Sequence, residues 1–372
     1  MSADSLLTTP LCNLHREQGA KMVPFAGYDM PVQYPLGVLK EHQHTRAAAG
    51  LFDVSHMGQI KVAGEGAAEA LEALMPIDVI DLPVGRQRYS LLTNDAGGVM
   101  DDLMVANCDE YFHLVVNAAC KTADFAHLKA SLPSHITCEM LDDRALLALQ
   151  GPKAREVLSR LAAAAATMTF MDTADVEVGG IPCWVSCSGY TGEDGYELSV
   201  AASQAEPLAK LLLAEAEVEF IGLGARDSLR LEAGLCLYGH ELSEAISPIS
   251  ANLLWAISVV RRPNGARAGG YPGSEVIAAD IDNGVSRKRV LLDIDGKAPV
   301  RDGCQLLDGS GAVVGEVCSG GFGPSVGKPI AMAYVDTAAL DAAEPLYAAV
   351  RNKKIPVSPR KKAYVAQRYY RG

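Results

Sequence analysis

The run Thr93-Asn94-Asp95-Ala96-Gly97-Gly98-Val99-Met100-Asp101-Asp102-Leu103 joins a glycine turn to a pair of adjacent acids. Its Asn, Asp and Gly residues are typical of a hairpin turn, and apolar runs on both sides predict strands at Tyr89–Thr93 and Leu103–Asn107. A third strand at His113–Asn117 and a helix at Ala119–Ser131 follow. Strands that alternate with short helices in this way predict an α+β fold.

The same mixture of elements extends on both sides of this run. Before it, proline- and glycine-rich sequence up to about Gly50 predicts irregular loops with one helix near Leu39–Ala49. After it, strands and helices continue as far as Arg262, and a Gly- and Pro-rich connector follows through about Pro272. From Arg289 onward, short β-like runs between turns predict a small all-β domain. A chain of 372 residues is therefore expected to form two or three domains.

Composition excludes several classes of protein. The formal charge of −12 argues against a general nucleic-acid binder, which needs a basic surface. The nine cysteines are scattered without a C-x-x-C pair, so we expect neither a zinc site nor a disulfide framework. The longest apolar stretch, roughly Ile249–Val260, is too short to span a bilayer, and Met1–Pro10 lacks the features of a signal peptide. We expect a soluble protein without a membrane partner.

Asp101 and Asp102 are the first candidates for chemistry. Adjacent side chains at the start of a strand point to opposite faces, so one acid can face a turn while the other is directed inward. Desolvation raises the pKa of an inward carboxyl and suits it to proton transfer near neutral pH. The residues alone slightly favour the alternative, which is a turn with two solvated carboxylates.

The loop Gly189–Glu197 concentrates glycines, tyrosines and acids in nine positions. Glycines let the backbone approach a ligand closely, and Tyr190 offers a flat surface for stacking. Glu197 lies where a strand begins, and its carboxylate can accept the paired hydrogen bonds of an aminopyrimidine edge. An ordinary hairpin loop is the alternative.

Arg226 lies near a predicted helix start, where a cation is unfavourable with the helix dipole. Either a carboxylate ligand or local pairing with Asp227 and Glu232 explains it, and the two interpretations have equal weight. Arg230 fits a structural role within the helix better. The preceding Gly222-Leu223-Gly224 lacks the third glycine of a dinucleotide-binding turn, so we do not expect a Rossmann site.

The C-terminal segment is basic. Its last 22 residues, Arg351–Gly372, hold eight Lys or Arg residues and no acid. A solvated basic surface and a landing site for an acidic ligand or partner explain this pattern equally well.

Several motifs, in order along the chain, resemble the glycine cleavage T-protein family. None is specific alone, but together they cover essentially the whole sequence. One departure is Tyr28, where the family commonly has Trp. The matching runs are Phe25-Ala26-Gly27-Tyr28, Leu51-Phe52-Asp53-Val54-Ser55-His56-Met57, Thr93 to Leu103 as quoted above, Leu149-Gln150-Gly151-Pro152, Gly189-Tyr190-Thr191-Gly192-Glu193-Asp194-Gly195, Gly224-Ala225-Arg226-Asp227-Ser228-Leu229-Arg230-Leu231-Glu232-Ala233-Gly234, Leu237-Tyr238-Gly239 and Ser319-Gly320-Gly321-Phe322-Gly323-Pro324-Ser325.

The resemblance implies a multidomain α+β fold, the three-domain cloverleaf of aminomethyltransferases with a C-terminal β-barrel. The first expected domain is a folate-binding α+β unit of residues 1–55 plus 141–265. The second is a ferredoxin-like α+β unit of residues 56–140, and the third is the barrel, residues 280–372.

The resemblance also implies an activity. The one-carbon unit of an aminomethyl group, carried on the lipoyl arm of H protein, passes to tetrahydrofolate. Ammonia, methylenetetrahydrofolate and dihydrolipoyl H protein are the products. Tetrahydrofolate is then a co-substrate, lipoylated H protein is the partner, and no metal is expected. The basic tail would face polyglutamate or the acidic H protein. The expected location is the bacterial cytoplasm, or the mitochondrial matrix for a processed eukaryotic protein.

The family's functional residues map onto this sequence position by position. Asp102 matches the catalytic aspartate, which orients folate and makes its amine a better attacking group, and Asp101 is expected to hold the turn. Glu197 is expected to bind the pterin edge. The other expected folate-binding residues are Arg226, Tyr369, Tyr89, Asn117, Tyr190 and Met57.

Three related kinds of protein are weaker alternatives. A folate-dependent demethylase would keep a folate pocket but has no need of this Gly-Tyr-Thr-Gly-Glu-Asp-Gly loop. A sarcosine-oxidase-type protein requires a flavin domain, for which the chain has no room. A non-catalytic folate-binding protein of iron–sulfur assembly would carry a lysine–glycine–cysteine motif in its C-terminal half, which this sequence lacks.

Overall fold

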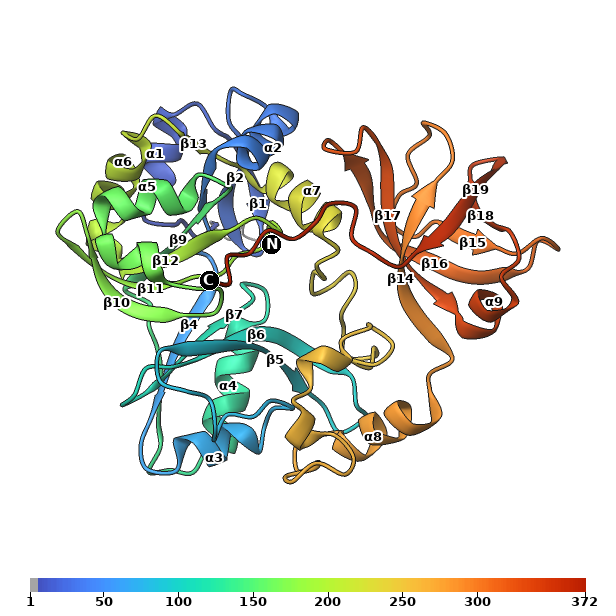
Figure 1. Cartoon of the computed structure of the whole chain (residues 1–372), viewed down its shortest axis with the longest axis horizontal. Coiled ribbons are helices and arrows are strands. Elements are labelled where there is room, and N and C mark those ends of the chain that lie inside the picture. The colour runs from blue at the N-terminus through green and yellow to red at the C-terminus, as the bar shows by residue number, and fades with distance from the viewer. Residues whose placement is uncertain (1–5) are drawn as a thin grey trace, which may run out of the picture.

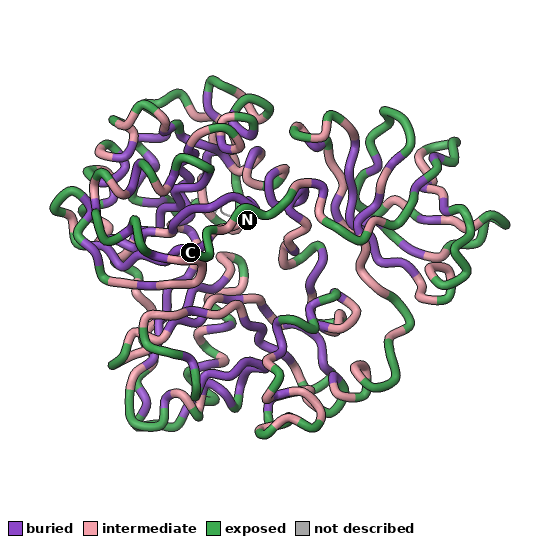
Figure 2. Tube along the Cα trace, viewed as in Figure 1, coloured by how far each residue is buried: buried purple, intermediate pink, exposed green. Residues whose placement is uncertain are grey.

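The computed structural model describes residues 6–372, so residues 1–5 of the first expected domain lie outside the described part of the chain. Figure 1 shows three lobes arranged as a cloverleaf, each built on its own β-structure. In Figure 2 the buried stretches follow the strands of these lobes, and exposed loops form the outside. The expected multidomain α+β fold is confirmed.

The first lobe is a six-stranded sheet in the order β10-β11-β12-β9-β3-β13. Its strands are antiparallel except for the parallel pair β13 and β3. The strand bounds are β3 Ala49–Asp53, β9 Arg144–Gln150, β10 Thr173–Val178, β11 Ile181–Ser186, β12 Gly195–Ala201 and β13 Val218–Phe220. Helices α1 Cys12–Glu17, α2 Val38–Ala47, α5 Ala154–Leu161 and α6 Ala205–Leu213 belong to this lobe.

The core of this lobe explains why β3 is buried along its whole length. Leu51 is fully buried among aliphatic side chains of β9, β12 and α5, and Phe52 packs on the opposite face. Burying one such side chain contributes about 1.5–3 kcal/mol. A strand covered on both faces is apolar throughout, as the sequence Ala49–Asp53 is up to its last residue.

The second lobe is a five-stranded antiparallel sheet in the order β5-β6-β7-β4-β8. Its strands are β4 Gly58–Ala63, β5 Arg86–Thr93, β6 Val99–Asn107, β7 Phe112–Val116 and β8 Thr137–Met140. Helices α3 Ala67–Glu72 and α4 Lys121–Ser131 contribute buried residues to the core of this lobe.

The third lobe is a closed barrel in the order β14-β17-β16-β15-β18-β19, which confirms the expected C-terminal β-barrel. Closure leaves no unpaired sheet edge. The strands are β14 Arg287–Ile294, β15 Gln305–Leu307, β16 Val313–Gly323, β17 Lys328–Asp336, β18 Leu346–Val350 and β19 Lys353–Arg360, with helix α9 Thr337–Ala342 between β17 and β18.

The N-terminal segment differs from the irregular loops that its prolines suggested. Strands β1 Lys21–Phe25 and β2 Tyr28–Gln33 form a hairpin. Ala26 and Gly27 both have positive φ, at 48° and 82°, which is the geometry of a tight two-residue turn. A two-stranded sheet has a free edge on each strand, so a proline without an N–H group is tolerated there.

Helix α7, Leu223–Ala233, packs closely against this hairpin. A Cβ atom at Gly222 would lie 2.4 Å from the carbonyl oxygen of Val32, which leaves no room for a larger residue. Glu41 also accepts a hydrogen bond from the Gly222 N–H at 2.8 Å. The glycine turn before α7 therefore serves packing between this helix and the hairpin.

The segment that follows α7 lies against the second lobe. Leu253 packs in one cluster with Leu91 of β5, and Arg261 and Arg267 both pair with the buried Glu72. Helix α8, Ser274–Asn283, ends this segment. The domain limits expected from the sequence stay a prediction. We propose that residues 235–283 belong with 56–140, in place of the limit at 265.

Candidate functional site

The two adjacent acids lie inside β6 and not in the turn that precedes it. β6 already begins at Val99, which pairs with Thr93 of β5. The register of this strand pair shifts between Thr93 and Leu92 of β5. Strand geometry then sends the two side chains to opposite faces. Asp101 is fully buried, and Asp102 keeps part of its surface accessible.

Asp102 is held by two side chains from the neighbouring strands of the sheet. The Tyr89 hydroxyl of β5 donates to its Oδ2 at 3.1 Å, and the Asn117 amide after β7 donates to its Oδ1 at 2.8 Å. Burial, together with the charge of Asp101, raises the pKa of Asp102 to about 7, although both hydrogen bonds oppose that rise. A carboxyl with this pKa can accept or release a proton at neutral pH.

Asp101 does not hold the turn, so that expectation is wrong. Its Oδ2 accepts the backbone N–H of Asn117 at 3.0 Å and its Oδ1 accepts the side-chain amide of Asn117 at 2.9 Å. The turn is held by Asn94, whose Oδ1 accepts the Gly98 N–H at 2.9 Å. Asp101 therefore fixes the corner between β7 and α4, because it is the inward residue of the pair.

The loop Gly189–Gly195 is closely packed. A Cβ atom at Gly189 would lie 1.7 Å from the side-chain oxygen of Gln150, and Gly192 has φ of 80°. Thr191 and Glu193 are fully buried, and Glu193 pairs with Arg46 at 2.9 Å. The glycines are required by packing within the protein, and the close approach of this loop to a ligand stays a prediction.

Tyr190 and Arg226 come together at the side of this loop. The Arg226 guanidinium lies 4.7 Å from the centroid of the Tyr190 ring, a cation–π contact. The Tyr190 hydroxyl donates to the carbonyl oxygen of Cys236. Glu197 of β12 accepts a hydrogen bond from the Ser188 hydroxyl at 2.8 Å, and its charge acts on Arg226.

The electrostatics of Arg226 favour the ligand interpretation over the ion-pair interpretation. Within residues 6–372, Asp227 pairs with Arg230, Glu232 pairs with His42 and Arg46, and no ion pair involves Arg226. Its Nη1 is buried without a hydrogen-bond partner in the same part of the chain. Burial lowers the pKa of Arg226, because a desolvated guanidinium is less stable as a cation. An acceptor from a ligand would relieve this cost.

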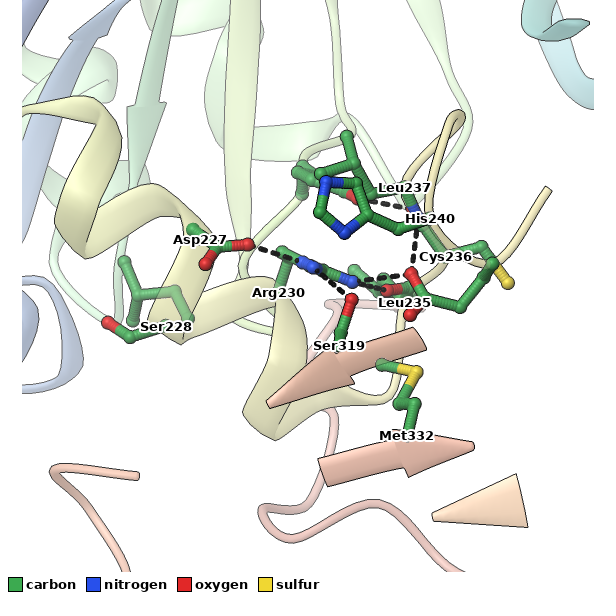
Figure 3. A network of polar contacts seen from close by, with 12 residues as sticks. Asp227, Ser228, Arg230, Leu235, Cys236, Leu237, His240, Ser319 and Met332 are labelled. Atoms are coloured by element: carbon green, nitrogen blue, oxygen red, sulfur yellow. Dashed lines mark hydrogen bonds and ion pairs between the residues drawn. The ribbon is translucent and has the colours of Figure 1, made fainter. Parts of the chain in front are cut away.

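Arg230 has the structural role expected of it (Figure 3). Its guanidinium is almost fully buried and donates to Asp227 at 2.8 Å, to Glu241 at 2.7 Å and to Ser319 of the barrel at 2.8 Å. Glu241 also accepts the N–H of Leu237 at 3.0 Å. The network ties α7 to β16 and fixes the loop that carries the Cys236 carbonyl group.

Two of the expected site residues are not among these contacts. Met57 is partly buried in a cluster with Phe52, Val115 and Met104. Met104 lies on the same face of β6 as Asp102, so this cluster adjoins the face of the sheet to which Asp102 points. Tyr369 stacks on Phe170 with ring centroids 4.1 Å apart and planes 11° from parallel. It belongs to the C-terminal segment that crosses the loop, where the N–H of Arg368 donates to the Gly192 carbonyl at 2.8 Å. The contacts described here thus join Asp102, Tyr89 and Asn117 directly, and Tyr190, Arg226 and Glu197 as a second group.

Trp255 is a neighbour of the site that sequence reasoning missed. Its ring stacks on Tyr89 at 5.1 Å, yet 62% of its surface is exposed. Both aromatic residues line a cavity of about 520 Å³ that Arg88 and Arg262 also border. The sequence offered one signal for this residue: Trp255 is one of only two tryptophans in the chain and lies in a short apolar run.

Between residues 6 and 372, no group of three or more His, Cys, Asp or Glu side chains is placed to hold a metal ion. None of the helices in that range combines the length and apolarity that a bilayer crossing requires.

Comparison with known proteins identifies this arrangement. The GCVT N-terminal domain family matches residues 11–261, and the glycine cleavage T-protein C-terminal barrel domain family matches residues 287–365. The mitochondrial aminomethyltransferase of Dictyostelium discoideum is 42% identical over 386 residues, covering 99% of this chain and 94% of that protein. The mitochondrial aminomethyltransferase of Canis lupus familiaris is also 42% identical, over 376 residues, covering 99% and 92%.

A solved structure extends the likeness to the fold. The glycine cleavage system aminomethyltransferase T from Bartonella henselae superimposes with a TM-score of 0.92 at 42% identity, and the match covers 99% of this chain and 100% of that one. Fold and sequence therefore define a transferase of the aminomethyltransferase class. The chain belongs to the glycine cleavage T-protein family.

Proposed function

We propose that this protein transfers the one-carbon unit of the aminomethyl-lipoyl arm of H protein to tetrahydrofolate. Ammonia is released, and methylenetetrahydrofolate and dihydrolipoyl H protein are formed. The observation that carries the proposal is the Asp102 carboxyl, partly accessible between Tyr89 and Asn117 and with its pKa raised to about 7.

Tetrahydrofolate is the proposed co-substrate, and it would supply the amine nitrogens that accept the carbon. The side chains present fit such a molecule. Glu197 has one carboxylate oxygen engaged by Ser188 and retains acceptor capacity for the amino and ring N–H groups of a pterin. The Nη1 of Arg226, which has no hydrogen-bond partner among residues 6–372, offers a donor to a pterin carbonyl or a glutamate carboxylate.

Asp102 would act by position and by proton transfer. Its ionised form can accept a hydrogen bond from the folate amine, which orients that nitrogen and increases its electron density for attack. Tyr89 and Asn117 hold both carboxylate oxygens, so the group does not rotate away. Met57, Tyr190 and Tyr369 complete the proposed set of folate-binding residues.

Lipoylated H protein is the proposed partner. The exposed Lys361 and Lys362 of the C-terminal segment give a positive surface that suits an acidic protein or polyglutamate. Neither nucleic acid nor membrane is part of the proposal, and the bacterial cytoplasm is the proposed location, although the curated relatives named above are mitochondrial.

The direct test mixes the purified protein with tetrahydrofolate and aminomethyl-loaded H protein and follows ammonia release. We expect release that depends on both tetrahydrofolate and the protein. Release at the same rate without tetrahydrofolate would show that the acceptor is misassigned. H protein without lipoate is the matched control and should give no signal.

A further inference from the structure

A second pair of acids lies directly behind Asp102. Asp101 of β6 is fully buried, and Asp124 of the first turn of α4 is 2% exposed. The two carboxyl groups lie close enough for the charge of Asp101 and a side-chain hydrogen bond between them to raise the pKa of Asp124. The Oδ2 of Asp124 is buried without a hydrogen-bond partner in the described part of the chain.

Two carboxyl groups in such contact cannot both be ionised without a compensating cation. The titratable groups that face the pair are Asp102 of β6, the Cys120 thiol just before α4 and the Tyr238 phenol from the loop after α7. All three are neutral or negative at pH 7, so they do not stabilise a second negative charge. The pair therefore keeps one proton.

The hydrogen bonds around the pair show where that proton lies. Asp101 already accepts two N–H groups of Asn117, which stabilise its negative charge. Among residues 6–372, no N–H group donates to the Asp124 carboxyl in this way. Burial and the charge of Asp101 accordingly raise the pKa of Asp124 to about 9.

These contacts form a closed path between β6, β7 and α4. Asn117 begins the corner that leads into α4, because its carbonyl oxygen accepts the N–H groups of Cys120 at 3.0 Å and Lys121 at 2.9 Å. Its side-chain amide donates both to Asp101 at 2.9 Å and to Asp102 at 2.8 Å. Asn117 thus links the two acids, so whatever holds Asp101 in place also fixes the position of Asp102.

We propose that Asp124 is a positioning residue that acts as a neutral acid. Its carboxyl O–H donates to Asp101, and this hydrogen-bonded pair fixes Asn117 and, through Asn117, the carboxylate of Asp102. The inference rests on the proposed function insofar as Asp102 takes part in the reaction. It also places a single fixed negative charge beside Asp102.

The kinetic test compares two substitutions of Asp124 in the full-length protein. Asp124→Asn keeps a neutral N–H donor toward Asp101, whereas Asp124→Leu removes it at similar volume. For Asp124→Leu we expect kcat to fall by about tenfold or more and the acidic limb of the kcat profile to move to higher pH by about one unit. The reason is that Asn117, no longer fixed through Asp101, holds the Asp102 carboxylate less firmly, and the Asn117 hydrogen bond is one that opposes the rise in the pKa of Asp102. KM for H protein should stay within about twofold, and Asp124→Asn should restore both kcat and the limb.

Leu128→Ala is the matched control. Leu128 is a fully buried residue of the same helix that packs in the core of the second lobe and belongs to neither acid pair. It should lower the melting temperature at least as much as Asp124→Leu without moving the acidic limb. An unmoved limb in Asp124→Leu, or equal losses in the Asn and Leu variants, would overturn the proposal.

A second measurement does not depend on the reaction. In protein labelled with ¹³C at the aspartate carboxyl carbons, one signal that disappears in Asp124→Asn should remain protonated at pH 7 and titrate above pH 8. Titration of that signal near pH 4 would refute the neutral-acid role. If Asp102→Asn retained full activity while Asp124 titrated as expected, the proposed function would fail and the neutral acid pair would stand.

Discussion

The Asp102 side chain is partly accessible, yet burial and the charge of Asp101 disfavour its ionised form. A raised folded-state pKa means that the folded protein binds the proton of Asp102 more tightly than the unfolded chain does. Its contribution to stability is complete below the ordinary pKa of 3.8 and is lost as the pH rises through about 7. Ionisation of Asp102 therefore lowers the free energy of unfolding of the protein. Such a loss of stability is common for reactive groups.

Asp102→Asn should separate catalysis from stability. We expect ammonia release to fall by about 10²- to 10⁴-fold with folate affinity changed much less. The melting temperature should rise relative to the natural chain at pH 8 and should change little at pH 4. Kinetics, folate titration and calorimetry at the two pH values check this. Asp101→Asn is the comparison, and it should lose stability at both pH values, because Asp101 anchors the corner at Asn117.

The pH dependence of the natural protein follows from the same group. If the carboxylate of Asp102 is the working form, kcat/KM rises with pH through an apparent pKa near 7 and then levels off. A rate profile that is flat between pH 5 and 8 would contradict the role given to Asp102.

Arg226 offers a second residue-scale prediction. Arg226→Met should weaken folate binding, because the buried donors toward the ligand are lost. It should also raise the melting temperature of the ligand-free protein, because it removes a half-buried cation that has no ion-pair partner among residues 6–372. A fluorescence titration with folate checks the expected loss of affinity. Thermal unfolding without folate checks the expected rise in melting temperature. Arg46→Met is the control, and it should lower the melting temperature, because Arg46 pairs with the buried Glu193 and Glu232.

At the scale of elements, helix α7 contacts both the first lobe and the barrel. Arg226 contacts Tyr190, and Arg230, one turn further along the same face of the helix, donates to the barrel residue Ser319. The Glu232 carboxylate of the same helix accepts the backbone N–H of Ser325 at 2.7 Å. A helix with this many buried charges is stable only while every partner is present.

Arg230→Met should therefore destabilise the protein by about 3–5 kcal/mol, because Glu241 is left buried and without its guanidinium partner. Denaturant unfolding followed by tryptophan fluorescence measures this. The double substitution Arg230→Met with Glu241→Gln should recover part of the loss. No recovery would mean that packing, and not charge pairing, accounts for the effect.

The elements themselves were largely predictable, and their long-range contacts were not. Periodic apolar runs such as Ala145–Gln150 and Ala67–Leu74 became β9 and α3 within two residues. The β1–β2 hairpin was missed because its prolines resemble those of a loop until the free edges of a two-stranded sheet are known. At the site, Asp102 was predictable from its motif. The partners of Asp101 and the stacking of Trp255 on Tyr89 were not, since they join residues far apart in the sequence.

The whole molecule carries its charge unevenly, with an acidic body and a basic C-terminal segment. In the structure, part of that segment is used internally, because Arg360 pairs with Asp293 and Arg368 lies 3.6 Å from Glu193. Lys361 and Lys362 remain exposed. For these two lysines both sequence interpretations, a solvated surface and a landing site for an acidic partner, stay open.

Charge reversal of Lys361 and Lys362 to Glu should weaken H-protein binding, and the difference should shrink as salt is added. Lys297→Glu is the control, because it reverses the same kind of charge at another exposed position of the barrel lobe. Unchanged binding at low salt would leave the tail as an ordinary solvated surface.

The place of β3 in its sheet has a consequence for synthesis on the ribosome. This buried apolar strand lies between β9, which is made about a hundred residues later, and β13, which ends at Phe220. At about 5–20 residues per second, β3 waits roughly 5–20 s for β9 and roughly 10–30 s for β13. We expect nascent chains that end before β13 to engage chaperones and to be cleaved readily by proteases. Chains that extend past α7 should resist both.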